Sequence, residues 1–156
     1  MTIVEKINLQ ELYEIDDHLW LEETIKLLKE KRLSELDLDN LIEELESLAQ
    51  RDKLAMASLL QQVMIHLLLL NYWEREYERN CHHWQYEIAN FRDQLNGRLT
   101  ANLTKSVTED FNKIYQKALK KVNIKTDYTL NLPTQCPYTL EQLLDDDWFP
   151  ENKQGV

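Results

Sequence analysis

Glycine and proline are scarce in this chain of 156 residues. It has two glycines and three prolines, and neither residue occurs before Gly97. Because β-proteins and α/β enzymes depend on these residues in their turns, the sequence argues against both classes. The scarcity of glycine also argues against a phosphate-binding loop, so we expect no nucleotide or other cofactor. The first 96 residues instead favour long, uninterrupted helices.

Cysteine and long apolar runs are also scarce. Two cysteines, Cys81 and Cys136, are too few for a disulfide framework. No charged-then-apolar signal segment opens the sequence. The longest apolar run, 63–70, contains His66 and is too short to cross a bilayer. We therefore expect a cytoplasmic protein that does not bind a membrane.

Negative charge predominates, with a formal net charge of −10. Residues 1–50 contain 14 acidic and 5 basic side chains. Such a chain is repelled by phosphate backbones, so we expect no nucleic-acid partner. One set of lysines recurs toward the C-terminal end of a predicted helix, which is a common position for basic residues: Lys113, Lys117, Lys120, Lys121 and Lys125.

Hydrophobic residues recur at helical spacing over four stretches. The predicted helices cover about 9–31, 37–77, 80–99 and 103–122. An extended connector (123–138) and a short helix with an aromatic tail (139–150) follow. Ser34 with Asp37, and Thr139 with Gln142, have the spacing of capping boxes. We predict an all-α fold: one domain over 1–156, a bundle of four to five long helices with a short C-terminal helix and a docked tail.

The predicted helix 37–77 carries an apolar stripe that includes Leu38, Ile42 and Leu45 and stays in phase across 49–52. A helix of roughly 60 Å exceeds the span of a compact domain of this size. The exposed part of the stripe predicts a symmetric homodimer, because a two-fold contact matches a patch to itself. The alternative is a kink with Asp52 as the N-cap of a second helix.

The chain resembles the bacterial domain of unknown function family 29, over nearly its whole length. The residues that carry the resemblance are Tyr13, Asp16, Trp20 and Leu21; the run 36–46; His66-Leu67-Leu68; Trp84 with 87–92; and Cys136-Pro137-Tyr138-Thr139-Leu140 with Leu143, Leu144 and Trp148. The resemblance implies an all-α fold and brings no activity with it.

His66 is the most interesting single residue, because it follows Leu59 and Val63 at core spacing. A bundle metal site would combine it with carboxylates such as Glu43 and Glu44, yet the Glu-x-x-His pair of such sites is missing. We interpret His66 as a structural histidine that is mostly buried, hydrogen-bonded and without a metal. Cys81-His82-His83 is poorly arranged to chelate one ion, because neighbouring residues on a helix point about 100° apart.

Other candidate residues lie at positions that carry the family resemblance. The charged residues Asp16, Glu44, Glu87 and Arg92 are interpreted as salt-bridging residues that fix helix register, and Trp84 as a core anchor.

Two functions remain open. The first is a non-enzymatic protein-interaction or regulatory module that binds another protein, itself, or both. The alternative is a metal-binding bundle or enzyme that uses His66 with nearby carboxylates.

Overall fold

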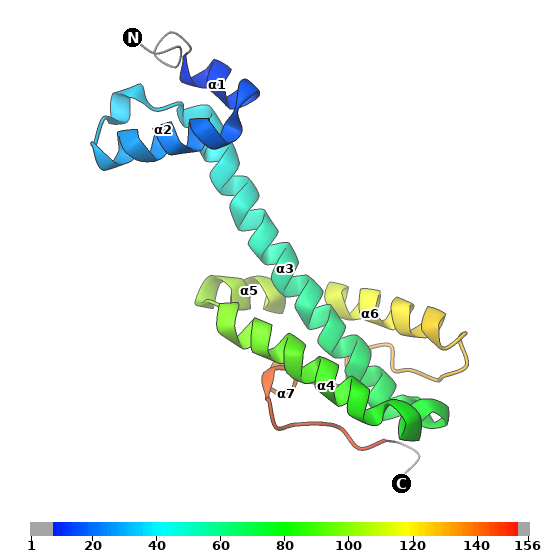
Figure 1. Cartoon of the computed structure of the whole chain (residues 1–156). Helices are drawn as coiled ribbons and strands as arrows, with labels where there is room; N and C mark the ends of the chain where they lie inside the picture. The colour runs from blue at the N-terminus through cyan, green and yellow to red at the C-terminus, as the bar shows by residue number, and fades with distance from the viewer. Residues whose placement is uncertain (1–7, 153–156) are drawn as a thin grey trace. The chain divides into compact units, whose positions relative to one another are not determined.

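The computed structural model describes residues 8–152, and 77% of the described chain is helical. Within this range lie seven α-helices and one 3-10 helix, η2, and no β-strand (Figure 1). The predicted all-α class is therefore confirmed. Tertiary contacts divide the chain into an N-terminal unit that ends at Gln50 and a C-terminal unit that begins at Arg51.

The N-terminal unit begins with two helices, whereas one was expected over 9–31. α1 spans Leu9–Ile15 and α2 spans Asp17–Lys29. Between them Asp16 has an extended backbone, and its carboxylate accepts a 3.0 Å hydrogen bond from the N–H of Leu19. Aspartate satisfies a free N–H at a helix start better than it supports a helix interior. Capping by Asp16 therefore overrides the helical periodicity.

α2 ends in a Schellman turn. Lys31 adopts the left-handed conformation (φ 58°), and the N–H of Arg32 donates to the carbonyl of Leu27 at 2.9 Å. η2 follows at Leu33–Glu35. Ser34 thus lies inside a 3-10 turn, and the capping box expected there is wrong, because the chain turns once more before α3 begins.

Trp20 organises the small core of the N-terminal unit. Within residues 8–50 the buried hydrophobic residues are Leu12, Trp20 and Leu27. The indole N–H of Trp20 donates to the carboxylate of Asp37 at 3.2 Å. The ring of Tyr13 meets the indole edge-on, with 4.9 Å between centroids. Asp37 therefore serves a tertiary contact, which explains why it does not complete the expected capping box.

α3 spans Leu38–Tyr72 as one helix of 35 residues. It is helical throughout 49–52, so the predicted continuity is confirmed and the alternative with Asp52 as an N-cap is wrong. Its part in the C-terminal unit supplies nine of the 19 residues in the buried core cluster, between Met56 and Leu70. α3 is also the one helix within 8–152 that is long and apolar enough to cross a membrane, but 56% of its most apolar window is buried in the protein.

α3 ends earlier than the predicted residue 77. Trp73 leaves the helical conformation (φ −91°, ψ 79°), and α4 spans Glu74–Arg98. The chain changes direction at Trp73, and the indole of Trp73 stacks on that of Trp84 in α4, with centroids 5.9 Å apart. A buried aromatic pair contributes about 0.5–1.5 kcal/mol beyond its area. This stack and the packing of α4 along α3 favour the break over a longer helix.

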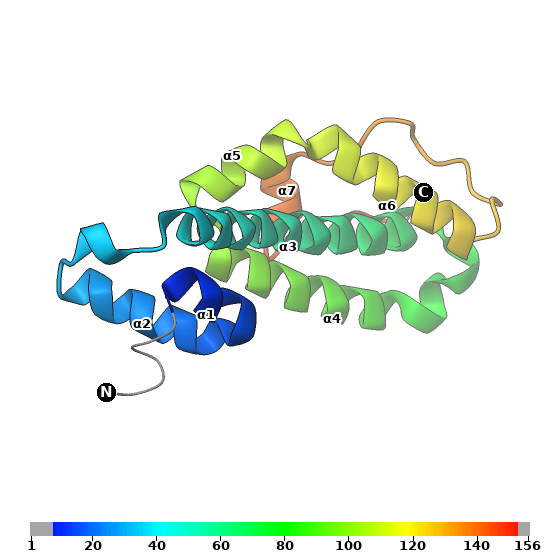
Figure 2. The same ribbon diagram turned by 90° about the horizontal axis from the view of Figure 1, so that it is seen from above.

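α4 and α6 lie on opposite sides of α3 in the C-terminal unit (Figure 2). α5 spans Ala101–Glu109, with Thr100 as its N-cap, and α6 spans Phe111–Lys125. The single helix expected over 103–122 is therefore wrong. The interruption falls at Asp110, a residue type that favours helix ends over helix interiors.

The chain after α6 returns across the helices. α6 continues to Lys125, so the connector starts there rather than at residue 123. α7 spans Leu140–Leu144, and the predicted capping box of Thr139 and Gln142 is present. The tail is docked as expected, because Trp148 and Phe149 pack against the core.

Candidate functional site

His66 lies on α3 and is half-buried. Its Nδ1 is 2.7 Å from the carbonyl oxygen of Gln62. Since a carbonyl only accepts, Nδ1 must carry the hydrogen, and Nε2 of the neutral ring keeps its lone pair. The ring also contacts Phe91 of α4, with 5.4 Å between centroids. The predicted hydrogen bond is thus present, while the side chain is less buried than expected.

The surroundings of His66 hold it in the neutral form. Burial lowers the pKa of the imidazole below its usual value, and the charges of His83 and Lys125 act in the same direction. The Gln62 carbonyl and the carboxylate of Glu87 oppose them, and the net shift is downward. His66 is therefore a neutral hydrogen-bond acceptor at pH 7.

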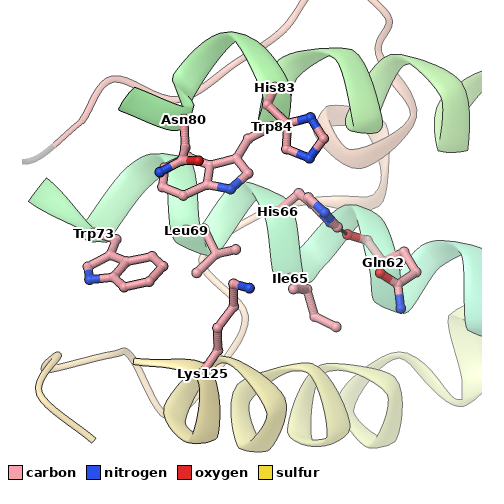
Figure 3. Close-up of a pocket in the computed structure, with 9 residues that line it drawn as sticks. All are labelled: Gln62, Ile65, His66, Leu69, Trp73, Asn80, His83, Trp84 and Lys125. Carbon is pink, nitrogen blue, oxygen red and sulfur yellow. Dashed lines mark hydrogen bonds between the residues drawn. The ribbon is translucent and has the colours of Figure 1, made fainter. Parts of the chain in front are cut away.

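A pocket of about 460 Å³ opens beside His66, between α3, α4 and α6 (Figure 3). Lys125 extends into it from α6, while His83 and Trp84 reach it from α4. The stacked indoles of Trp73 and Trp84 belong to its wall. The break after α3 therefore helps to build the pocket, because it positions Trp73.

Positive charge prevails in this pocket. Among residues 8–152, Lys125 is the one lining residue with a full formal charge at pH 7, and no aspartate or glutamate of this range lines the pocket. No carboxylate within residues 8–152 forms an ion pair with Lys125. Polar groups in its wall include the ammonium of Lys125, the imidazoles of His66 and His83, and the amide of Gln62.

Arg92 stabilises the fold through hydrogen bonds to backbone carbonyls. It is fully buried on α4, and its guanidinium donates to the carbonyls of Gln142, Leu143 and Trp148 at 2.8–2.9 Å. It also lies 5.1 Å from the ring centroid of Phe149. The predicted salt bridge is therefore wrong for Arg92. Carbonyls at the C-terminal end of α7 carry partial negative charge and take the place of a carboxylate.

The remaining acidic candidates have separate roles. In the N-terminal unit Asp16 caps α2, and the carboxylate of Glu44 accepts a hydrogen bond from the hydroxyl of Tyr13. Glu43 is exposed. In the C-terminal unit Glu87 acts on His66 through its charge. The salt bridges expected for Asp16, Glu44 and Glu87 are absent from the part of the chain that the structure describes.

Metal and thiol chemistry find little support among residues 8–152. No group of three or more His, Cys, Asp or Glu side chains there is arranged to hold a metal ion. Burial raises the pKa of the Cys136 thiol, which donates a 3.4 Å hydrogen bond to the carbonyl of Tyr138. A protonated thiol is a poor nucleophile.

The N-terminal unit presents a second candidate, an apolar surface on α3. We call Leu38, Ile42, Leu45 and Leu48 the α3 stripe. Each of these side chains is 50–56% exposed, and their spacing puts them on one side of the helix. Sequence reasoning found this stripe from its period.

Sequence reasoning missed the pocket. It treated Trp84 as a core anchor and Lys125 as an ordinary helix-end lysine. The signal that could have found the pocket is weak, since its residues come from three helices spread over more than 60 positions.

Residues 12–149 match the model of a domain of unknown function, DUF29. The match covers most of the chain, so the protein belongs to this family, and the resemblance noted in the sequence is confirmed. No match was found among curated proteins or solved structures. The family brings no specific function, so a function must be argued from the chain's own residues.

Proposed function

We propose that this DUF29 protein is a non-enzymatic protein-interaction module, and that the α3 stripe of its N-terminal unit binds a basic amphipathic helix of another protein. The supporting observation is an imbalance of apolar surface. Within residues 8–50, nine large hydrophobic residues are exposed and three are buried. Scattered exposed leucines are ordinary, but a contiguous apolar stripe is typical of an interaction site.

Charge selects the kind of partner. The α3 stripe is flanked by Asp39, Glu43 and Glu46, and no lysine or arginine occurs between Arg32 and Arg51. A helix with basic residues beside its apolar face complements such a surface. A second copy would bring the same acidic flank against it, which like-charge repulsion disfavours. We therefore favour a different protein over the homodimer suggested by the stripe alone.

The enzymatic alternative has less support. The Nδ1–H of His66 donates to a backbone carbonyl, so no carboxylate among residues 8–152 orients its ring through this nitrogen as in a catalytic dyad. Cys136 is partly buried, and its protonated thiol does not supply a nucleophile. An interaction module working in the cytoplasm remains the better proposal.

Site-specific photo-crosslinking tests the proposal. A photoreactive phenylalanine analogue replaces Leu45 in the full chain within its native cells, and the matched control replaces Ile124, which is 58% exposed on α6. We expect Leu45 to capture a different protein through a segment with a basic amphipathic pattern, and Ile124 not to capture it. A product formed by two copies of this chain would refute the basic partner and restore the homodimer.

A binding measurement then tests the chemistry of the contact. The captured segment is synthesised and titrated against the wild-type protein, L45S and I124S by fluorescence anisotropy. We expect at least a tenfold loss of affinity for L45S, no loss for I124S, and weaker binding at higher salt. Equal affinity of L45S and the wild type would show that the α3 stripe is not the binding site.

A further inference from the structure

The pocket beside His66 has no part in the proposed contact, since all of its lining residues belong to the C-terminal unit. Its volume of about 460 Å³ lies within the 300–1,000 Å³ that is typical of small-molecule sites. Its wall combines apolar and aromatic side chains with polar and basic ones, so it can contact both a ring and a charged group.

The wall favours a flat ring. The indoles of Trp73 and Trp84 stack with an interplanar angle of 16°, and Leu69 lies beside them (Figure 3). Aromatic side chains bind planar rings through stacked or edge-on contacts. A flexible aliphatic ligand would gain less from this wall, because it would lose more conformational freedom on binding.

Charge favours an anion. The ammonium of Lys125 enters the pocket without a carboxylate partner among the described residues, and His83 adds a second basic group. A bound carboxylate would accept hydrogen bonds from the ammonium, and such charge-assisted bonds are about twice as strong as neutral ones.

His66 adds a requirement for a donor. Its Nδ1–H is used by the Gln62 carbonyl, so Nε2 accepts. A ligand that buries this nitrogen without offering a donor would leave it unsatisfied, which is unfavourable. A hydroxyl or N–H group on the ligand removes this cost.

We propose that the pocket between α3, α4 and α6 binds a small planar aromatic carboxylate that also carries a hydroxyl or N–H group. Stacking on Trp73 and Trp84 holds the ring, Lys125 holds the carboxylate, and Nε2 of His66 accepts from the ligand's donor.

Calorimetric titration of the full chain with 4-hydroxybenzoate tests the site, and 4-hydroxybenzamide, benzoate and inorganic phosphate serve as comparison probes. We expect saturable binding of 4-hydroxybenzoate with quenching of tryptophan fluorescence. The benzamide removes the charge, and benzoate removes the donor, so each should bind at least fivefold more weakly. Phosphate should not compete at equal concentration.

Variants then assign the roles. K125M keeps the apolar stem and should lower the affinity for 4-hydroxybenzoate at least tenfold, whereas K120M, on the same helix but outside the pocket, should not change it. H66F should abolish the preference for 4-hydroxybenzoate over benzoate. Absent binding to the wild type, equal binding of the benzamide, competition by phosphate, or an unchanged affinity of K125M would each overturn the proposal.

Discussion

Arg92 should be among the most costly residues to replace in the C-terminal unit. Its guanidinium is buried, and its three hydrogen bonds reach carbonyls 50 to 56 positions away. R92M retains the apolar stem and removes every donor. The carbonyl of Leu143 would then be buried without this donor, and the part-buried carbonyls of Gln142 and Trp148 would lose theirs, although Gln142 still accepts from the N–H of Asp145.

The magnitude follows from these three carbonyls. A buried acceptor that loses its partner costs about 1–3 kcal/mol, and two of the three contacts are only part-buried, so the set costs at most about 9 kcal/mol. Removing the guanidinium also returns its own desolvation cost, which is several kcal/mol for a buried ion. Burial indeed lowers the pKa of Arg92, with Asp145 and Asp146 acting in the opposite direction. The net loss should therefore be about 3–5 kcal/mol.

Urea unfolding followed by circular dichroism measures this loss. With an m-value of about 2 kcal/mol/M, a loss of about 4 kcal/mol lowers the midpoint by about 2 M. R98M is the matched control on the same helix, because Arg98 is half-exposed and its nitrogen lies 3.9 Å from Asp52. Such a surface pair contributes about 0–1 kcal/mol. A loss below about 1 kcal/mol for R92M would refute the account of Arg92.

Three smaller changes test other parts of the structure. K31G should raise stability by about 0.5–1 kcal/mol in thermal melts, because glycine adopts the left-handed conformation of Lys31 (φ 58°) without a Cβ penalty; a destabilised K31G would contradict it. T139A should lose about 1 kcal/mol in urea melts, because it removes the cap of α7. The lowered pKa of His66 means that the unfolded state binds more protons just below pH 6.5. Stability should therefore fall as pH drops from about 7.5 through 6.5 to the folded pKa, and H66Q should weaken this dependence; an unchanged pH profile in H66Q would refute it.

The features of the fold that could be predicted are those decided by residues close together in the sequence. The continuity of α3 depends on its own residues, since nothing across 49–52 breaks a helix and the apolar stripe keeps its phase. The capping box of Thr139 is equally local. Both predictions are confirmed, because the spacing of side chains along one helix decides them.

The breaks at Asp16, Trp73 and Asp110 could not be predicted from helical period. Asp16 ends α1 through its own side chain, which binds an N–H three residues on. Trp73 ends α3 where its ring stacks on a residue eleven positions later. These helix ends depend on capping or tertiary packing, which outweighs helix propensities of less than about 1 kcal/mol per residue.

Two cations of the C-terminal unit show why the site needed the structure. In sequence Arg92 and Lys125 are both basic residues on helices, yet their surroundings are opposite. Arg92 is buried against carbonyls that satisfy all three of its donating nitrogens, so it serves stability. Lys125 enters a pocket that no carboxylate of the described residues lines, so its charge remains for a ligand. The two assignments separate cleanly by experiment. R92M should lower stability, whereas K125M should leave stability within about 0.5 kcal/mol and lower only the affinity for the aromatic anion. A K125M variant that lost stability as R92M does would show that Lys125, too, is a structural residue.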